Sequence, residues 1–143
     1  MIYTVILNSN LRTSGSVGNA MYNFDWASAL QPGEYNMSWA ITTGNVAIND
    51  GNAILVSAEL GQTGAFICSA INTSAQSTNI IGTLISNEVG NSFFYGDRNS
   101  NGSLRLKRPT NNQFTVRLLS CDVVPLEITT VANYVLNLSF EKV

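Results

Sequence analysis

The sequence of 143 residues contains no histidine and few charged residues. Charged side chains make up 11% of it, compared with roughly 25% in an average soluble domain. Without an imidazole, a serine or cysteine nucleophile lacks its usual base, and zinc lacks its commonest nitrogen ligand. The nine acidic residues are scattered singly, which does not favour a paired-carboxylate mechanism. We therefore predict that the chain is not an enzyme and binds no cofactor or metal.

Other classes of protein are disfavoured by what is scarce. The formal net charge is -2, so no excess of basic residues is present to hold a phosphate backbone, and nucleic-acid binding is not expected. The longest apolar runs, such as residues 53–56, are far too short to span a bilayer. Residues 2–7 indicate a strand and lack the basic start of a signal peptide. The two cysteines, Cys68 and Cys121, lie among strand-like residues and are expected to be small buried side chains.

Hydrophobic residues make up 45% of the sequence, which argues against a disordered chain. They alternate with polar residues along short segments, the pattern of strands that bury one face. The alternation is clearest in residues 34–42 and 134–140, and residues 21–26 repeat it. The buried faces are predicted to carry Tyr35, Met37, Trp39 and Ile41 in the first segment, Tyr134, Leu136, Leu138 and Phe140 in the second, and Tyr22, Phe24 and Trp26 in the third.

Further strand-like segments are separated by turn-forming residues, which is typical of a sandwich or a closed barrel. These segments span residues 53–60, 65–71, 78–86, 92–95, 103–107 and 113–120. The best helical candidate is a turn or two at residues 27–31. The sequence therefore predicts an all-β fold, a single antiparallel β-sandwich of about eight to ten short strands over residues 1–143, with a jelly roll as the favoured topology.

The sequence has one concentration of basic residues, made up of Arg105, Lys107, Arg108 and Arg117. In an extended strand Arg105 and Lys107 share one face, while Leu104 and Leu106 share the other. The pattern indicates either a solvated sheet face or a contact with an acidic neighbouring subunit.

Three adjacent aromatic residues, Phe93, Phe94 and Tyr95, cannot all face inward in a strand. An exposed ring here either packs against a neighbouring subunit or loop, or provides a platform for a sugar. Residues 97–102 match the start of a calcium loop, with oxygen-bearing side chains at alternate positions before a glycine. Arg108 occupies the position of the expected bidentate glutamate and would repel the ion, so a hairpin tip is favoured instead.

The opening segment has the most unusual pattern. A strand ends in Leu7-Asn8-Ser9, and the motifs that follow are Arg12, Ser14-Gly15-Ser16, Asn19-Ala20, the aromatic residues 22–26 and Pro32-Gly33-Glu34-Tyr35. Over residues 1–40 this order resembles the amino-terminal pattern of small β-sandwich virion proteins of large and polinton-like DNA viruses of algae and protists.

The resemblance implies a structural virion protein, a minor or accessory capsid component that assembles with other capsid proteins inside the infected cell. It also implies a homo-oligomer, for which a trimer or a larger ring is compatible. Arg12 is expected to anchor its loop through a forked hydrogen bond to Asp25 or to backbone carbonyls. The alternative is a lectin-like or receptor-binding trimeric β-sandwich module. The predicted interaction residues are Arg12, Phe93, Phe94, Tyr95, Arg105, Lys107 and Arg108.

Overall fold

A computed structural model describes residues 1–44, 53–61, 80–85, 93–96, 104–120 and 131–143. Within these ranges the chain forms ten strands in two antiparallel sheets, one 3-10 turn (η1, Ser9–Leu11) and one short helix (α1, Trp26–Ala29). Neither helical segment in these ranges has the length and apolar character needed to cross a membrane. The predicted strand at residues 65–71 lies outside the described residues.

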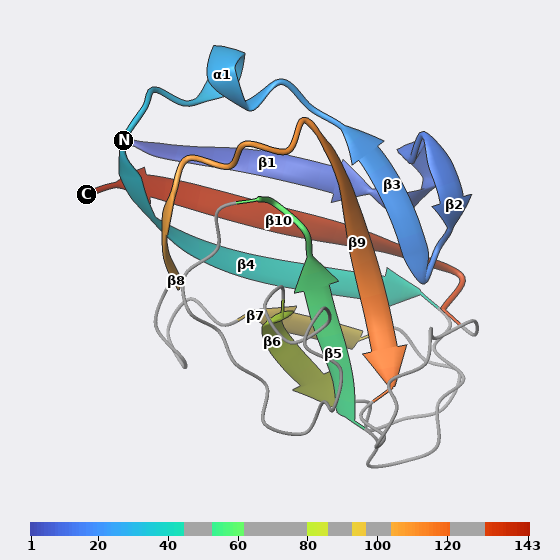
Figure 1. Cartoon of the computed structure of the whole chain (residues 1–143). Helices are drawn as coiled ribbons and strands as arrows, with labels where there is room; N and C mark the ends of the chain where they lie inside the picture. The colour runs from blue at the N-terminus through green and yellow to red at the C-terminus, as the bar shows by residue number, and fades with distance from the viewer. Residues whose placement is uncertain (45–52, 62–79, 86–92, 97–103, 121–130) are drawn as a thin grey trace, which may run out of the picture.

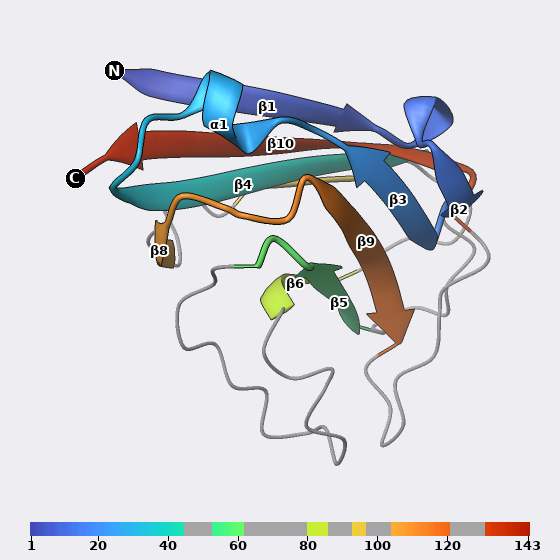
Figure 2. The same cartoon turned by 45° about the horizontal axis from the view of Figure 1, so that its top comes forward.

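Each sheet has five strands, and Figures 1 and 2 show the strands of one layer crossing those of the other. The first sheet contains β1 (Ile2–Asn8), β10 (Asn133–Lys142), β4 (Glu34–Gly44), β7 (Phe93–Gly96) and β8 (Leu104–Lys107). Both β7 and β8 pair with β4, β8 opposite its start and β7 further along. The second sheet contains β2 (Ser14–Ser16), β3 (Asn19–Asn23), β9 (Gln113–Ser120), β5 (Ala53–Ala58) and β6 (Ile80–Ile85).

The order in which the chain visits the two sheets defines the topology. Apart from the short strands β2 and β8, the chain passes from β1 to β3, β4 and β5 by changing sheet each time, stays in the second sheet for β6, and then alternates again through β7, β9 and β10. The facing orders β1-β10-β4-β7 and β3-β9-β5-β6 are those of a jelly roll built from two Greek keys. The predicted all-β sandwich and its jelly-roll topology are confirmed.

The core lies between the inner faces of the two sheets, and its largest contribution comes from β4 and β10. These strands pair over ten residues, so that their buried side chains stand side by side. The predicted alternation is confirmed: Tyr35, Met37, Trp39, Ile41, Tyr134, Leu136, Leu138 and Phe140 are each no more than 2% exposed. From the second sheet, Phe114, Val116 and Leu118 of β9 pack into the same cluster.

Trp26 joins the two layers at one end of the sandwich. The alternating pattern predicted a strand through residue 26, but β3 ends at Asn23 and α1 begins at Trp26. The chain turns here because the backbone N–H of Phe24 donates to Asn112 O (2.7 Å) and that of Trp26 to Asn112 Oδ1 (3.2 Å). The Trp26 ring lies 5.6 Å from Phe114 of the second sheet and 5.5 Å from Phe140 of the first, centroid to centroid.

Trp39 makes a second close contact between the layers. Its indole Nε1 donates to Ile81 O on β6 (3.1 Å). A Cβ atom at Gly82 would collide with the Trp39 ring, so β6 approaches β4 this closely because residue 82 has no side chain.

Candidate interaction surface

Apart from Val143 after β10, the large apolar residues of the described chain that are most exposed lie on and next to β1. This strand pairs with β10 on one side and has no strand on its other side within the described ranges. The side chains of Ile2, Tyr3 and Ile6 are 43%, 38% and 66% exposed, and Leu11 in η1 is 77% exposed. Apolar exposure on this scale is unusual for one short segment, and it marks a candidate contact surface.

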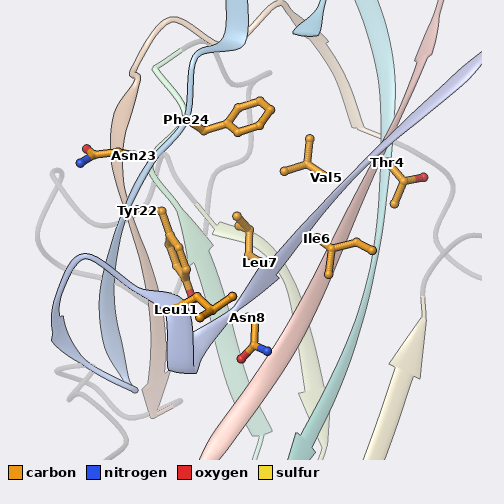
Figure 3. Close-up of a pocket in the computed structure, with 9 residues that line it drawn as sticks. All are labelled: Thr4, Val5, Ile6, Leu7, Asn8, Leu11, Tyr22, Asn23 and Phe24. Carbon is orange, nitrogen blue, oxygen red and sulfur yellow. The ribbon is translucent and has the colours of Figure 1, made fainter.

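A groove of about 300 Å³ runs along this edge, between the open sides of the two sheets. Figure 3 shows the side chains of Val5 and Leu7 on β1 facing Tyr22 and Phe24, and Leu11 lines the same groove. The lining combines these apolar side chains with the polar residues Thr4, Asn8 and Asn23, and none of the lining side chains is charged.

The turn after β1 is held by Arg12, as one of the two alternatives from the sequence predicts. Its Nη1 donates to Ser9 O (2.8 Å) and its Nε to Gly15 O (2.9 Å), so the guanidinium spans both sides of the loop. The alternative partner, Asp25, makes no such bond with it in the described structure. Gly15 has φ of +83°, and a Cβ there would collide with Asn19 O, so the hairpin from β2 to β3 requires glycine.

Replacing Arg12 with alanine is expected to lower the free energy of unfolding by about 1–2 kcal/mol, since it removes two charge-assisted hydrogen bonds from a half-buried group. Urea denaturation measures the loss, and amide hydrogen exchange is expected to speed up mainly over residues 9–16. Arg12→Lys is the control, because lysine keeps the charge but cannot span both carbonyls. Unchanged stability and exchange in the alanine variant would contradict this anchoring role.

Below the groove, two buried tyrosines connect the sheets. Tyr22 Oη on β3 donates to Tyr134 Oη on β10 (2.8 Å), and the backbone N–H of Tyr134 donates to the buried Ser9 Oγ (2.9 Å). Burial raises the pKa of both phenols above the usual value, and the contact with Tyr22 raises the pKa of Tyr134 further. Both hydroxyls therefore stay neutral over the ordinary pH range.

The predicted face of β8 is present. Arg105 and Lys107 are exposed, whereas Leu106 is buried and Leu104 packs against the core. Arg105 Nη2 donates to Glu34 Oε2 on β4 (2.6 Å), and this hydrogen bond lowers the pKa of the exposed Glu34 carboxyl. Lys107 is paired opposite Glu34 in the register. The arginine thus has an acidic neighbour within its own chain.

The other two basic residues do not extend this face. Arg108 is half-buried and donates from Nη1 to Leu30 O (3.2 Å), closing the loop before β4. Arg117 lies on β9 in the second sheet, 3.6 Å from Glu59 Oε1. The prediction of one basic concentration is wrong for Arg117, because β8 and β9 follow one another along the chain but lie in different sheets.

Several predicted site residues are only partly tested. Phe93, Phe94 and Tyr95 belong to β7 and pair opposite Thr43, Thr42 and Ile41 of β4, but their side chains lie outside the described ones. Cys68, Cys121 and the calcium-like residues 97–102 also lie outside the described residues. Among those that are described, no group of three or more metal-binding side chains occurs.

The sequence reasoning missed Ile6 and Leu11 as surface residues. The signal was available, because residues 2–7 are apolar on both faces of the strand. Such a strand is either covered on both sides or exposed at an edge, and the local pattern does not distinguish the two.

Comparison with known proteins finds similarity among solved structures. No family model matches the chain, and no curated protein matches it. Among solved structures, the chain is similar to a crystal structure of SeMet-labelled mavirus penton protein, with a TM-score of 0.46 and 16% sequence identity. The alignment covers 66% of this chain, and the chain spans 36% of the length of that protein.

Proposed function

We propose that the chain is a structural virion protein, a minor or accessory capsid component that acts through protein–protein contacts and has no catalytic role. The observation that carries the proposal is a jelly roll with an exposed, apolar edge strand at β1. Jelly rolls occur in viral capsid proteins as well as in lectins and cupins, so the fold alone does not decide between these functions. The edge strand adds a surface suited to subunit contact.

Two features of the sequence support the same proposal. The order of motifs over residues 1–40 resembles that of small virion proteins, as described above. The low charge content, 11% of residues, limits repulsion between identical subunits that pack closely. Both features fit a chain that packs against copies of itself or against other capsid proteins in the virion.

The proposal is tested on purified virus particles from the cells that produce the chain. Mass spectrometry is expected to find the chain in many copies per particle, and immunogold labelling with an antibody against it is expected to mark the particles. A fraction of the same density from uninfected cells serves as the control. Absence of the chain from intact particles would contradict a structural virion role.

A glycan-binding module is the second candidate, because the half-buried ring of Phe24 lines the groove together with Asn8. Figure 3 shows Asn23 pointing away from the groove, so the polar side chains do not converge on a sugar-sized space. A glycan array with the purified chain is expected to give no saturable binding. Saturable binding that is lost in Phe24→Ala, combined with absence from particles, would favour this second function.

A further inference from the structure

The free edge of β1 lacks the features that usually protect a sheet edge. Natural edge strands are kept short, or carry lysine, proline or a bulge, which prevents pairing with another chain. The other described edge strands are shorter: β2 has three residues, β7 and β8 have four each, and β6 has six, with a register shift in its pairing with β5. β8 also carries Arg105 and Lys107. β1 has seven residues, and the sequence from Ile2 to Leu11 contains no charged residue and no proline.

Both faces of β1 present apolar side chains to solvent. Val5 and Leu7 are buried on the inner face, and Tyr3 on the same face is 38% exposed. On the outer face, Ile2 and Ile6 are 43% and 66% exposed, with the exposed Thr4 between them. A strand added to this edge would therefore cover apolar surface on both faces while satisfying backbone groups.

We propose that β1 pairs antiparallel with β1 of a second copy of this chain, which joins two first sheets across a two-fold axis. The inference rests on the proposed function, since it names a contact through which the subunits meet. A two-fold contact uses the same surface on both copies, so the strand must be complementary to itself.

One register makes β1 self-complementary. With Thr4 on the axis, opposite the partner's Thr4, Ile2 lies opposite the partner's Ile6 and Tyr3 opposite the partner's Val5. Threonine pairs and aromatic pairs with β-branched residues are among the favourable cross-strand pairs. The absence of charged residues from Ile2 to Leu11 means that no like charges face each other in this arrangement.

The two neighbouring allowed registers are poorer. Side chains keep to their own face only if the shift is an even number of residues, which would place either Val5 opposite the partner's Val5 or Tyr3 opposite the partner's Tyr3. With Val5 on the axis, Ile2 would face the partner's Asn8, and Ile6 would face the partner's Thr4. With Tyr3 on the axis, Ile2 would face the partner's Thr4, so both registers lose the apolar pairs of the outer face. The Thr4-centred register is therefore the one we propose.

The register makes residue 4 a specific test, because it is the position on β1 that faces itself. Sedimentation velocity is expected to show a reversible dimer of the wild-type chain at tens of micromolar. Thr4→Lys and Thr4→Glu are each expected to weaken self-association by about tenfold or more, because like charges then lie directly opposite. An equimolar mixture of the two variants is expected to restore it, since lysine then faces glutamate.

The control variant is Thr42→Lys, which adds the same charge on the same sheet face but on β4, away from the edge. It is expected to leave the dimer intact. Thr4 is exposed, and its Oγ1 makes an exposed hydrogen bond with Ser139 Oγ (3.3 Å), so the substitutions are expected to leave the fold intact, which circular dichroism checks.

A second measurement needs no variant. Amide hydrogen exchange of the wild-type chain is expected to slow over residues 2–8 as protein concentration rises. A wild-type chain that stays monomeric, or a Thr4→Lys variant that associates as strongly as wild type, would overturn the β1 pairing. Loss of association without recovery in the mixture would also overturn it, by refuting the register. None of these results bears on whether particles contain the chain, so the two proposals fail separately.

Discussion

Replacing Trp26 with alanine is expected to lower the free energy of unfolding by about 3–5 kcal/mol. The Trp26 side chain is 1% exposed, and its ring contacts Phe114 of one sheet and Phe140 of the other. Truncation leaves a cavity between the two sheets. The sheets cannot close it by moving toward each other, because that movement would break strand pairing within each sheet. Since domains of this size are stable by about 5–15 kcal/mol, the variant is expected to be close to unfolding. Urea denaturation followed by far-ultraviolet circular dichroism measures the loss.

Trp26→Phe is the matched control. It keeps an aromatic ring between the sheets but loses the hydrogen bond from Nε1 to Asn111 O (2.9 Å) and part of the ring volume. We expect a smaller loss of about 1–3 kcal/mol. If alanine and phenylalanine at residue 26 cost the same, the packing between the sheets is not what makes Trp26 important.

Alkaline pH is expected to destabilise the protein steeply through Tyr22 and Tyr134. Burial raises the pKa of both phenols, so above pH 10 the unfolded chain releases protons that the folded chain keeps. Their contribution is complete below pH 10 and is lost as the pH rises from there toward the folded-state values. Above pH 10, each tyrosine that stays protonated in the folded chain but not in the unfolded chain lowers the free energy of unfolding by about 1.4 kcal/mol per pH unit. Urea midpoints between pH 8 and 11 measure the slope.

Substitutions separate the contribution of the Tyr22 and Tyr134 hydroxyls from other causes of alkaline destabilisation. Replacing both tyrosines with phenylalanine removes the pair together, so stability at pH 7 is expected to change little, and the slope above pH 10 is expected to flatten. Tyr134→Phe alone leaves the buried Tyr22 hydroxyl without its partner and is expected to cost about 1–3 kcal/mol at pH 7. An equally steep alkaline slope in the double variant would contradict this assignment.

The sequence predicts best those strands that bury one face and expose the other. In β4 and β10 every second residue is buried, and the alternation is visible without knowing which strands pair. The same reasoning fails at Trp26, where the aromatic alternation continues but the strand does not. The turn there depends on Asn112, a residue distant in the sequence, so no local pattern could have revealed it.

The candidate surface was harder to predict than the fold. Local periodicity describes the two faces of a strand but says nothing about its two edges, and exposure at β1 is a property of the edge. The basic residues show the same limit. Arg105 and Lys107 were correctly placed on one face because they are two residues apart, whereas Arg117 could be placed only once the sheet of β9 was known.

The pairing of β1 with β10 has a mechanical consequence. Ile2 lies opposite Glu141, so the outer ends of the two strands are neighbours at the same end of the first sheet, as Figure 1 shows. A force that pulls these ends apart acts along the inter-strand hydrogen bonds, which run across the strands. The bonds then break one after another, as in a zipper. Tension applied along the strands loads all of them together, so the sheet resists stretching far better than peeling.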